Sequence, residues 1–164
     1  MTRKWNLVLC ALCVLSVFLS RQAGAQDVRK VAVLPFDVYA EKDAAALRED
    51  IDSGISAELR KRKDLAIVPR DQYLQQISGK KIDERLAIAA GEAIGADYVI
   101  IGSLTAIGNL FSLDSRLIDV KQKKVLPGIY VQGSGKENVS SLSTQLAREI
   151  SLKISGKERI AGVV

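Results

Sequence analysis

The chain has 164 residues and a formal net charge of +5, with 24 Lys or Arg residues against 19 Asp or Glu residues and no histidine. Without histidine, catalytic triads that use an imidazole base and metal sites built on imidazole are excluded. Both cysteines, Cys10 and Cys13, lie near the amino terminus. Removal of that segment would also exclude thiol catalysis and cysteine-ligated zinc.

The amino-terminal segment has the pattern of a secretory signal peptide. Arg3 and Lys4 precede an apolar run over residues 5–19, and small residues follow at 23–25. The run is shorter than the ~20 residues of a permanent membrane-spanning helix, so a membrane anchor is the less favoured alternative. We expect cleavage after Ala25, export to the periplasm and no membrane span in the mature chain.

The mature chain would have 139 residues and a net charge of +2, because three basic residues leave with the signal. This length suits one domain with a substantial core. Nucleic acid is not an expected partner, since it needs a concentrated basic footprint.

The first half of the mature chain predicts a strand–helix–strand unit. Apolar runs at 30–36 and 65–69 predict two strands, each containing a proline near its end. Between them, apolar residues recur every fourth position, which predicts a helix over 44–62 with Asp43 as its cap. A unit of this length favours parallel pairing through a right-handed crossover.

Two further helices are expected before the longest apolar run. They cover residues 72–77 and 84–94, with Asp71 and Asp83 as caps and Gly95 ending the second. The run at 98–104 is apolar on both alternating faces, which is typical of a strand buried on both sides. We expect it to form the centre of the sheet together with residues 31–36.

After Gly108-Asn109 the pattern changes to alternation over 111–119, which predicts a half-exposed strand. A further strand is expected over 125–133, interrupted by Pro127-Gly128. A last helix is expected over 139–154, capped by Asn138. The predicted order is β-α-β-α-α-β-β-β-α. This order defines an α/β sandwich with a mixed five-stranded sheet and packing helices.

Few residues carry a chemical motif. Ser78-Gly79-Lys80-Lys81 matches the Ser-x-x-Lys pattern of penicillin-binding enzymes, but their other two motifs are missing from the chain. The run at 133–136 resembles the end of a phosphate loop, yet Tyr130 occupies the position of the first glycine and Glu137 that of Ser or Thr. We expect no catalytic residue, no cofactor and no metal.

Three segments, in one order, carry a resemblance to a known family. They are Val-Ala-Val-Leu-Pro-Phe at 31–36, Gly-Ala-Asp-Tyr-Val-Ile-Ile-Gly-Ser at 95–103, and Arg-Leu-Ile-Asp-Val at 116–120 followed by Lys-Val-Leu at 124–126. Together they resemble the TolB amino-terminal-domain family, which is related to the curli-secretion protein CsgG and to lipoprotein activators of cell-wall synthases. The resemblance implies a periplasmic, non-enzymatic docking module with envelope proteins as partners. It does not extend to the CsgG pore or the TolB propeller.

Two function hypotheses follow. The first is a non-catalytic periplasmic interaction module of a cell-envelope system for outer-membrane assembly or transport. The alternative is a serine enzyme or synthase-associated factor that acts on the cell wall through Ser78 and Lys81. For the first hypothesis, the strand edge near residues 125–133 is the expected docking surface, with Val125, Ile129, Tyr130 and Val131 as candidate residues.

The expected organisation is a signal peptide at 1–25, a TolB amino-terminal-like domain at 26–156, and a tail or the start of a following domain at 157–164. The last run, Glu-Arg-Ile-Ala-Gly-Val-Val, resembles the opening of a POTRA domain. This resemblance implies the front module of a BamA-type outer-membrane assembly protein, or a truncated relative of one.

Overall fold

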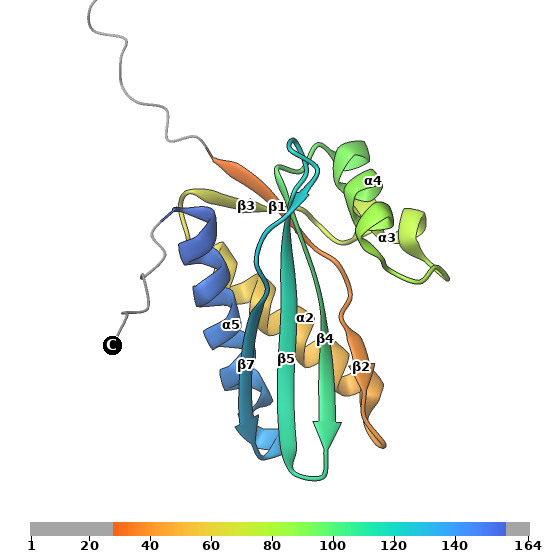
Figure 1. Cartoon of the computed structure of the whole chain (residues 1–164), viewed down its shortest axis with the longest axis vertical. Helices are drawn as coiled ribbons and strands as arrows, with labels where there is room; N and C mark the ends of the chain where they lie inside the picture. Colours follow the sequence, from red (N-terminus) through yellow and green to blue (C-terminus); the bar gives the residue numbers. More distant parts are fainter. Residues whose placement is uncertain (1–27, 157–164) are drawn as a thin grey trace, which may run out of the picture.

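The computed structural model describes residues 28–156 as strands and helices that alternate along the first part of the chain (Figure 1). The strands are β1 (Arg29–Val33), β2 (Asp37–Tyr39), β3 (Leu65–Ile67), β4 (Tyr98–Ile107), β5 (Leu110–Asp119), β6 (Lys124–Val125) and β7 (Ile129–Ser134). The helices are α2 (Ala44–Arg60), α3 (Asp71–Ile77), α4 (Glu84–Ile94) and α5 (Val139–Ile154), with a 3₁₀ turn η2 (Lys136–Asn138) before α5.

The sheet is mixed, which confirms the predicted fold class, but within residues 28–156 it has seven strands rather than the predicted five. Its main path runs β3-β1-β4-β5-β6, while β2 pairs with β4 and β7 pairs with β5 further along these long strands. The pairs β1–β3, β1–β4 and β2–β4 are parallel, and the pairs of β5 with β4, β6 and β7 are antiparallel. As predicted, β4 lies at the centre and β1 beside it.

One detail of the sheet differs from the prediction and one agrees with it. Residues 30–36 do not form one strand, because the chain leaves β1 before Pro35 and rejoins β4 as the short strand β2. As predicted, Pro127-Gly128 interrupts the strand expected over 125–133, which is divided into β6 and β7. In both places a proline, which lacks a backbone donor, interrupts the ladder.

The sheet packs helices on both faces, but not to the same extent (Figure 1). The long helices α2 and α5 lie against each other and cover one face along its length. The other face carries α3 and α4, whose cluster includes Ala32, Leu34, Val99, Ile101 and Ile118. These sheet residues all belong to the part of the sheet around β1, so the remainder of this face has no helix over it.

The expected helix caps hold at one position and fail at three. Asp83 accepts a hydrogen bond from the Leu86 amide at 2.8 Å and caps α4, which Gly95 ends in the left-handed conformation, both as predicted. Asp43 precedes α2 with φ 58° and makes no side-chain cap, since its carboxylate binds Lys136 Nζ at 2.7 Å. Asp71 lies inside the first turn of α3, where Arg70 occupies the cap position.

Asn138 also does not cap α5 with its side chain. Its backbone is helical because η2 runs directly into α5. Its side-chain nitrogen Nδ2 donates instead to the Ser134 carbonyl at 2.6 Å. In the part of the chain that the structure describes, no helix has the length and hydrophobicity to cross a membrane. The predicted signal peptide and the predicted 157–164 segment lie outside the described residues.

Candidate functional site

One half of one sheet face is open, and we call it the open sheet face. It belongs to the parts of β2, β4, β5 and β7 that extend beyond α3 and α4 (Figure 1). Its side chains all retain solvent exposure and come from alternate positions: Asp37, Tyr39, Ser103, Thr105, Ile107, Leu110, Ser112, Asp114, Tyr130 and Gln132.

The residues between these positions point to the opposite face and are buried. Leu104 and Leu113 are fully buried against α2 and α5, with Phe111 and Val131 beside them. The same strands are therefore core on one side and solvent-exposed on the other, as expected for alternating side chains.

Helix length explains why the face is left open. At 1.5 Å per residue, the 11 residues of α4 span about 16 Å, whereas the 10 residues of β4 span about 33 Å. The 17 residues of α2 span about 25 Å and reach further along the other face. The short helix layer can therefore cover only about half of β4, and it covers the half that pairs with β1.

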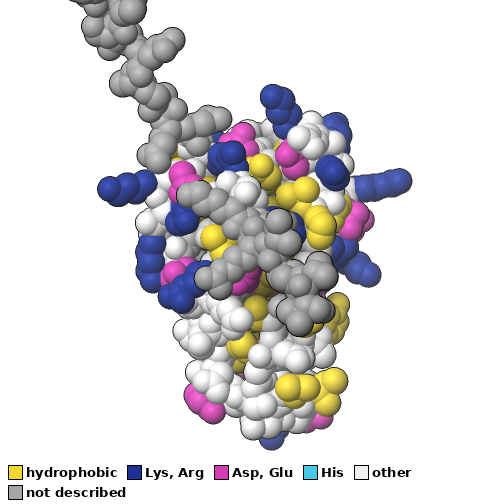
Figure 2. Space-filling model, turned by 60° about the vertical axis from the view of Figure 1, so that its left-hand side comes forward, with side chains coloured by type: hydrophobic (Ala, Val, Ile, Leu, Met, Phe, Trp, Pro, Cys, Tyr) yellow, Lys and Arg dark blue, Asp and Glu magenta, His cyan; other side chains and the backbone are white. Residues whose placement is uncertain are grey.

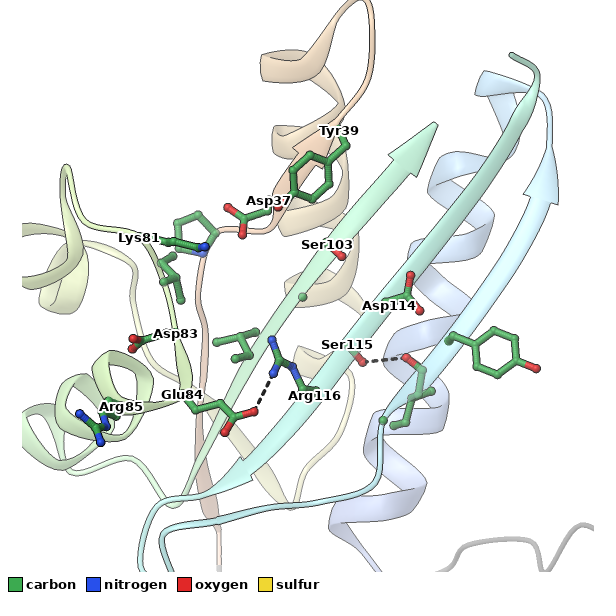
Figure 3. A pocket seen from close by; sticks show the side chains of 17 residues that line it. Asp37, Tyr39, Lys81, Asp83, Glu84, Arg85, Ser103, Asp114, Ser115 and Arg116 are labelled. Carbon is green, nitrogen blue, oxygen red and sulfur yellow. Dashed lines mark hydrogen bonds and ion pairs between the residues drawn. The ribbon is translucent and has the colours of Figure 1, made fainter. Parts of the chain in front are cut away.

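A salt bridge marks the boundary between the covered and open parts. Glu84, the first residue of α4, binds Arg116 of β5 through Oε1 and Nη1 at 2.6 Å (Figure 3). Beside this pair, a groove of about 750 Å³ lies between the sheet and the segment that leads into α4. Its lining includes Asp37, Tyr39, Ser103, Asp114 and Tyr130 from the sheet, and Lys81, Asp83 and Arg85 from the other wall.

The groove contains charges of both signs that form no ion pair within residues 28–156. Glu84 is engaged with Arg116, and Asp83 caps α4. By contrast, within residues 28–156 neither Asp37 nor Asp114 takes part in an ion pair; Asp114 accepts only a hydrogen bond from the Ser112 hydroxyl, at 3.3 Å. The site therefore offers two carboxylates and two exposed tyrosines for contacts with another molecule.

Of the four predicted docking residues, Tyr130 alone has an exposed side chain, at 70%. Val125 and Ile129 are partly buried, and Val131 is buried in the core beneath α5. The strand β7 that carries three of them pairs with β5 along one side. These residues can contribute backbone groups to an edge, and the docking role of that edge stays a prediction.

Ser78 and Lys81 do not have the geometry of a serine–lysine catalytic pair. A Ser-x-x-Lys motif brings its two side chains together when it lies on one helical turn. Here α3 ends at Ile77, Ser78 has an extended ψ of 131°, and Gly79 has φ 69°. Lys81 lines the groove while Ser78 does not, and no hydrogen bond joins the two within the described residues.

The residues that the sequence analysis missed are Asp37, Tyr39, Ser103 and Asp114. Asp37 and Tyr39 follow Pro35 and resemble loop residues, and Ser103 lies in a run that looked buried throughout. The sequence does mark Asp114 as solvent-facing, because it is a charged residue on an alternating strand. Which residues lie beside it, however, depends on how the strands pair. In the described part of the chain, no group of three or more Asp, Glu, Cys or His residues is placed to hold a metal ion.

The fold and the open sheet face define a mixed α/β domain whose long central hairpin is covered on one side only. The family model of the TolB amino-terminal domain matches residues 22–126, more than half of the chain. The chain therefore belongs to the TolB amino-terminal domain family.

The sequence of a TolB protein agrees with this assignment. The Tol-Pal system protein TolB of Mannheimia succiniciproducens is 28% identical over 96 residues, which are 58% of this chain and 20% of that protein. The alignment thus spans about one fifth of the relative's length.

Solved structures show the same fold. TolB from Acinetobacter baumannii matches with a TM-score of 0.57 at 14% identity, over 79% of this chain and 29% of that one. The LpoB C-terminal domain from Salmonella enterica matches with a TM-score of 0.52 at 15% identity, over 72% of this chain and 91% of that one. At such identities the likeness establishes the fold alone.

Proposed function

We propose that this chain is a non-catalytic protein-interaction module of a bacterial cell envelope and that it acts in the periplasm. The observation that carries the proposal is the open sheet face, a surface of four strands with exposed tyrosines and unpaired carboxylates on a rigid, two-sided core. Exposed aromatic side chains of this kind are enriched where proteins bind one another.

Family membership supports the cellular setting. A TolB amino-terminal domain is the matched family, and the relative with the same domain is a protein of the Tol-Pal system. The pattern of a signal peptide at residues 1–25 supports export. The finer assignment to an outer-membrane assembly or transport system, with ties to CsgG or to BamA-type proteins, is part of the proposal and rests on motif resemblance.

The edge of β7 is a second element of the proposed docking surface. Tyr130 stands at this edge and also borders the open sheet face, since it lies opposite Asp114 on β5. A partner could therefore contact the face with its side chains and the edge with its backbone.

Site-specific photocrosslinking tests the proposal in the bacterium that carries the gene. Tyr130→p-benzoylphenylalanine places a crosslinker at the open sheet face, and Gln145→p-benzoylphenylalanine places it on the exposed side of α5 as a matched control. We expect an adduct with an envelope protein from position 130 and none from position 145. Equal labelling at both positions, or none at either, would contradict the proposal.

A binding measurement extends the test once a partner has been captured. Tyr130→Ala removes the exposed ring without touching the core, so folding should be unaffected while affinity falls. If the variant binds the captured partner with unchanged affinity, Tyr130 is not part of the docking surface. A penicillin-type acylating reagent checks the serine-enzyme alternative, and we expect no covalent label on Ser78.

A further inference from the structure

We propose that the open sheet face binds an extended protein segment that places one Lys or Arg side chain over Ser103. This inference rests on the proposed function and names the chemistry of the partner. It follows from the cross-strand register, from the charges left unpaired in the groove, and from the shape of the surface beyond them.

The register places two carboxylates on either side of a small hydroxyl residue. Asp37 on β2 lies opposite Ser103 on β4, and Ser103 lies opposite Asp114 on β5 (Figure 3). Neighbouring strands are about 4.8 Å apart, so the backbone positions of Asp37 and Asp114 each lie roughly one strand spacing from that of Ser103. A cationic side chain that descends onto Ser103 would thus meet an acceptor on both sides.

Neither carboxylate forms an ion pair with another described residue of the protein. Within residues 28–156 the ion pairs near the groove engage Glu84 with Arg116, and none involves Asp37 or Asp114. The net charge of the whole chain is +5, so general attraction of cations to the protein does not explain binding at this point. Local pairing with these two side chains would provide the selectivity.

Two exposed tyrosines lie on the same face near this position. Tyr130 lies opposite Asp114 on β7, two strands from Ser103, and Tyr39 lies opposite Thr105, the next residue of β4 on this face after Ser103. Their side chains are 70% and 60% exposed. A long basic side chain that inclines toward either ring would gain a cation–π contact.

The opposite wall of the groove limits the partner to few basic residues. Lys81 and Arg85 line this wall and, in the described part of the chain, form no ion pair. A polybasic segment would be repelled by them. A segment with a single Lys or Arg turned toward the sheet avoids that repulsion.

The length of the surface favours a protein segment over a small cation. From Asp114 the open sheet face continues along β5, past Ser112, to Leu110. Leu110 is paired with Ile107 of β4 at the hairpin end, and both side chains are exposed. Four residues of strand cover about 13 Å, the span of about four extended residues of a partner. At the lower end of Figure 2, hydrophobic side chains form a patch beside a few charged ones. The partner segment would therefore combine one basic residue with apolar residues.

Peptide titration by NMR, on protein produced from the full-length chain, tests the inference. The probes are end-blocked nine-residue peptides, Ser-Thr-Val-Thr-Xaa-Thr-Val-Thr-Ser, in which Xaa is arginine, norleucine or glutamate and the two valines share its face in an extended chain. We expect the arginine peptide to bind about tenfold more tightly than the norleucine peptide, the glutamate peptide to bind most weakly, and the amides of Ser103 and Asp114 to shift.

Two double variants make the test specific. Asp37→Asn with Asp114→Asn should reduce the affinity of the arginine peptide to that of the norleucine peptide. Asp50→Asn with Glu149→Gln removes the same number of carboxylates from the exposed sides of α2 and α5, and should leave the preference intact.

Equal affinity for the arginine and norleucine peptides, retention of the preference in the first double variant, or no binding at millimolar concentration would overturn the inference. The photocrosslinking experiment is independent of this result. An adduct from position 130 without an arginine preference would refute the basic-segment inference and leave the proposed function standing.

Discussion

The Tyr73 hydroxyl donates a hydrogen bond of 2.5 Å to the carbonyl oxygen of Val33, and this bond joins α3 to the end of β1. The adjacent carbonyl on the same side of β1, that of Val31, accepts from the Val68 amide. Beyond it the chain turns at Pro69 into α3, so no backbone donor reaches Val33. The tyrosine hydroxyl therefore takes the place of the backbone amide that would otherwise bind this carbonyl in the sheet.

We expect Tyr73→Phe to fold and to lose about 1–3 kcal/mol of unfolding free energy, because it leaves a buried carbonyl unpaired. Burial raises the pKa of Tyr73 to about 12, so one tyrosine should resist ionisation in an absorbance titration of the wild type and not of the variant. Denaturant unfolding measures the loss. Tyr39→Phe, at a 60% exposed position, is the control and should be neutral.

The contribution of Asp52 to the stability of the protein should rise as the pH falls from 7.5 to 5. Asp52 of α2 is 8% exposed, and burial raises the pKa of its carboxyl to about 6 from 3.8, although Arg70 at 3.3 Å opposes the rise. The folded state thus binds a proton more readily than the unfolded chain, and stability is gained as Asp52 becomes protonated below pH 6.

Asp52→Asn removes this titration. The difference in unfolding free energy between wild type and variant should move by about 1–3 kcal/mol in favour of the wild type between pH 7.5 and pH 4.5. Thermal unfolding across this pH range measures it. A difference that stays constant with pH would show that Asp52 keeps an ordinary pKa in the folded state.

Ile100→Asp should abolish cooperative unfolding. Ile100 is fully buried on β4, at the centre of the sheet and under α2 and α5, so the variant would bury an unpaired charge. Ile107→Asp introduces the same side chain on the same strand at a position that is 72% exposed, and should change stability by less than about 0.5 kcal/mol. A normal melting transition in Ile100→Asp would show that this strand is not at the core.

Gly102→Ala should destabilise the protein by about 1–3 kcal/mol. A Cβ at this position would lie 2.3 Å from the Asp114 carbonyl oxygen and 2.3 Å from Phe36 Cε1, so the ring and a backbone strand would both have to move. Gly128→Ala is the matched control, since its nearest neighbour would be the Ser115 carbonyl oxygen at an ordinary 3.6 Å. Similar unfolding free energies for the two variants would contradict the close packing of Phe36 under β4.

The amino-acid sequence by itself determined the fold class, the central position of β4 and the parallel crossover from β1 to β3. It could do so because these features depend on local periodicity. The runs at 98–104 and 31–36 are apolar on both faces, and the spacing of Leu47, Ile51, Ile55 and Leu59 marks one face of a helix. The cap formed by Asp83 was also predictable from local sequence, because its carboxylate accepts from an amide only three residues away.

The open sheet face was decided only by the tertiary structure. Ser103 lies in a run that looks buried from its neighbours, but it is partly exposed because α4 is about half as long as β4. The Asp43 cap also depended on tertiary structure, since the Asp43 carboxylate binds Lys136, which is far along the chain, instead of a helix amide. Asp37, Ser103 and Asp114 come together because the distant strand β2 aligns in register with the β4–β5 hairpin, and that register depends on pairing across the sheet rather than on either segment alone.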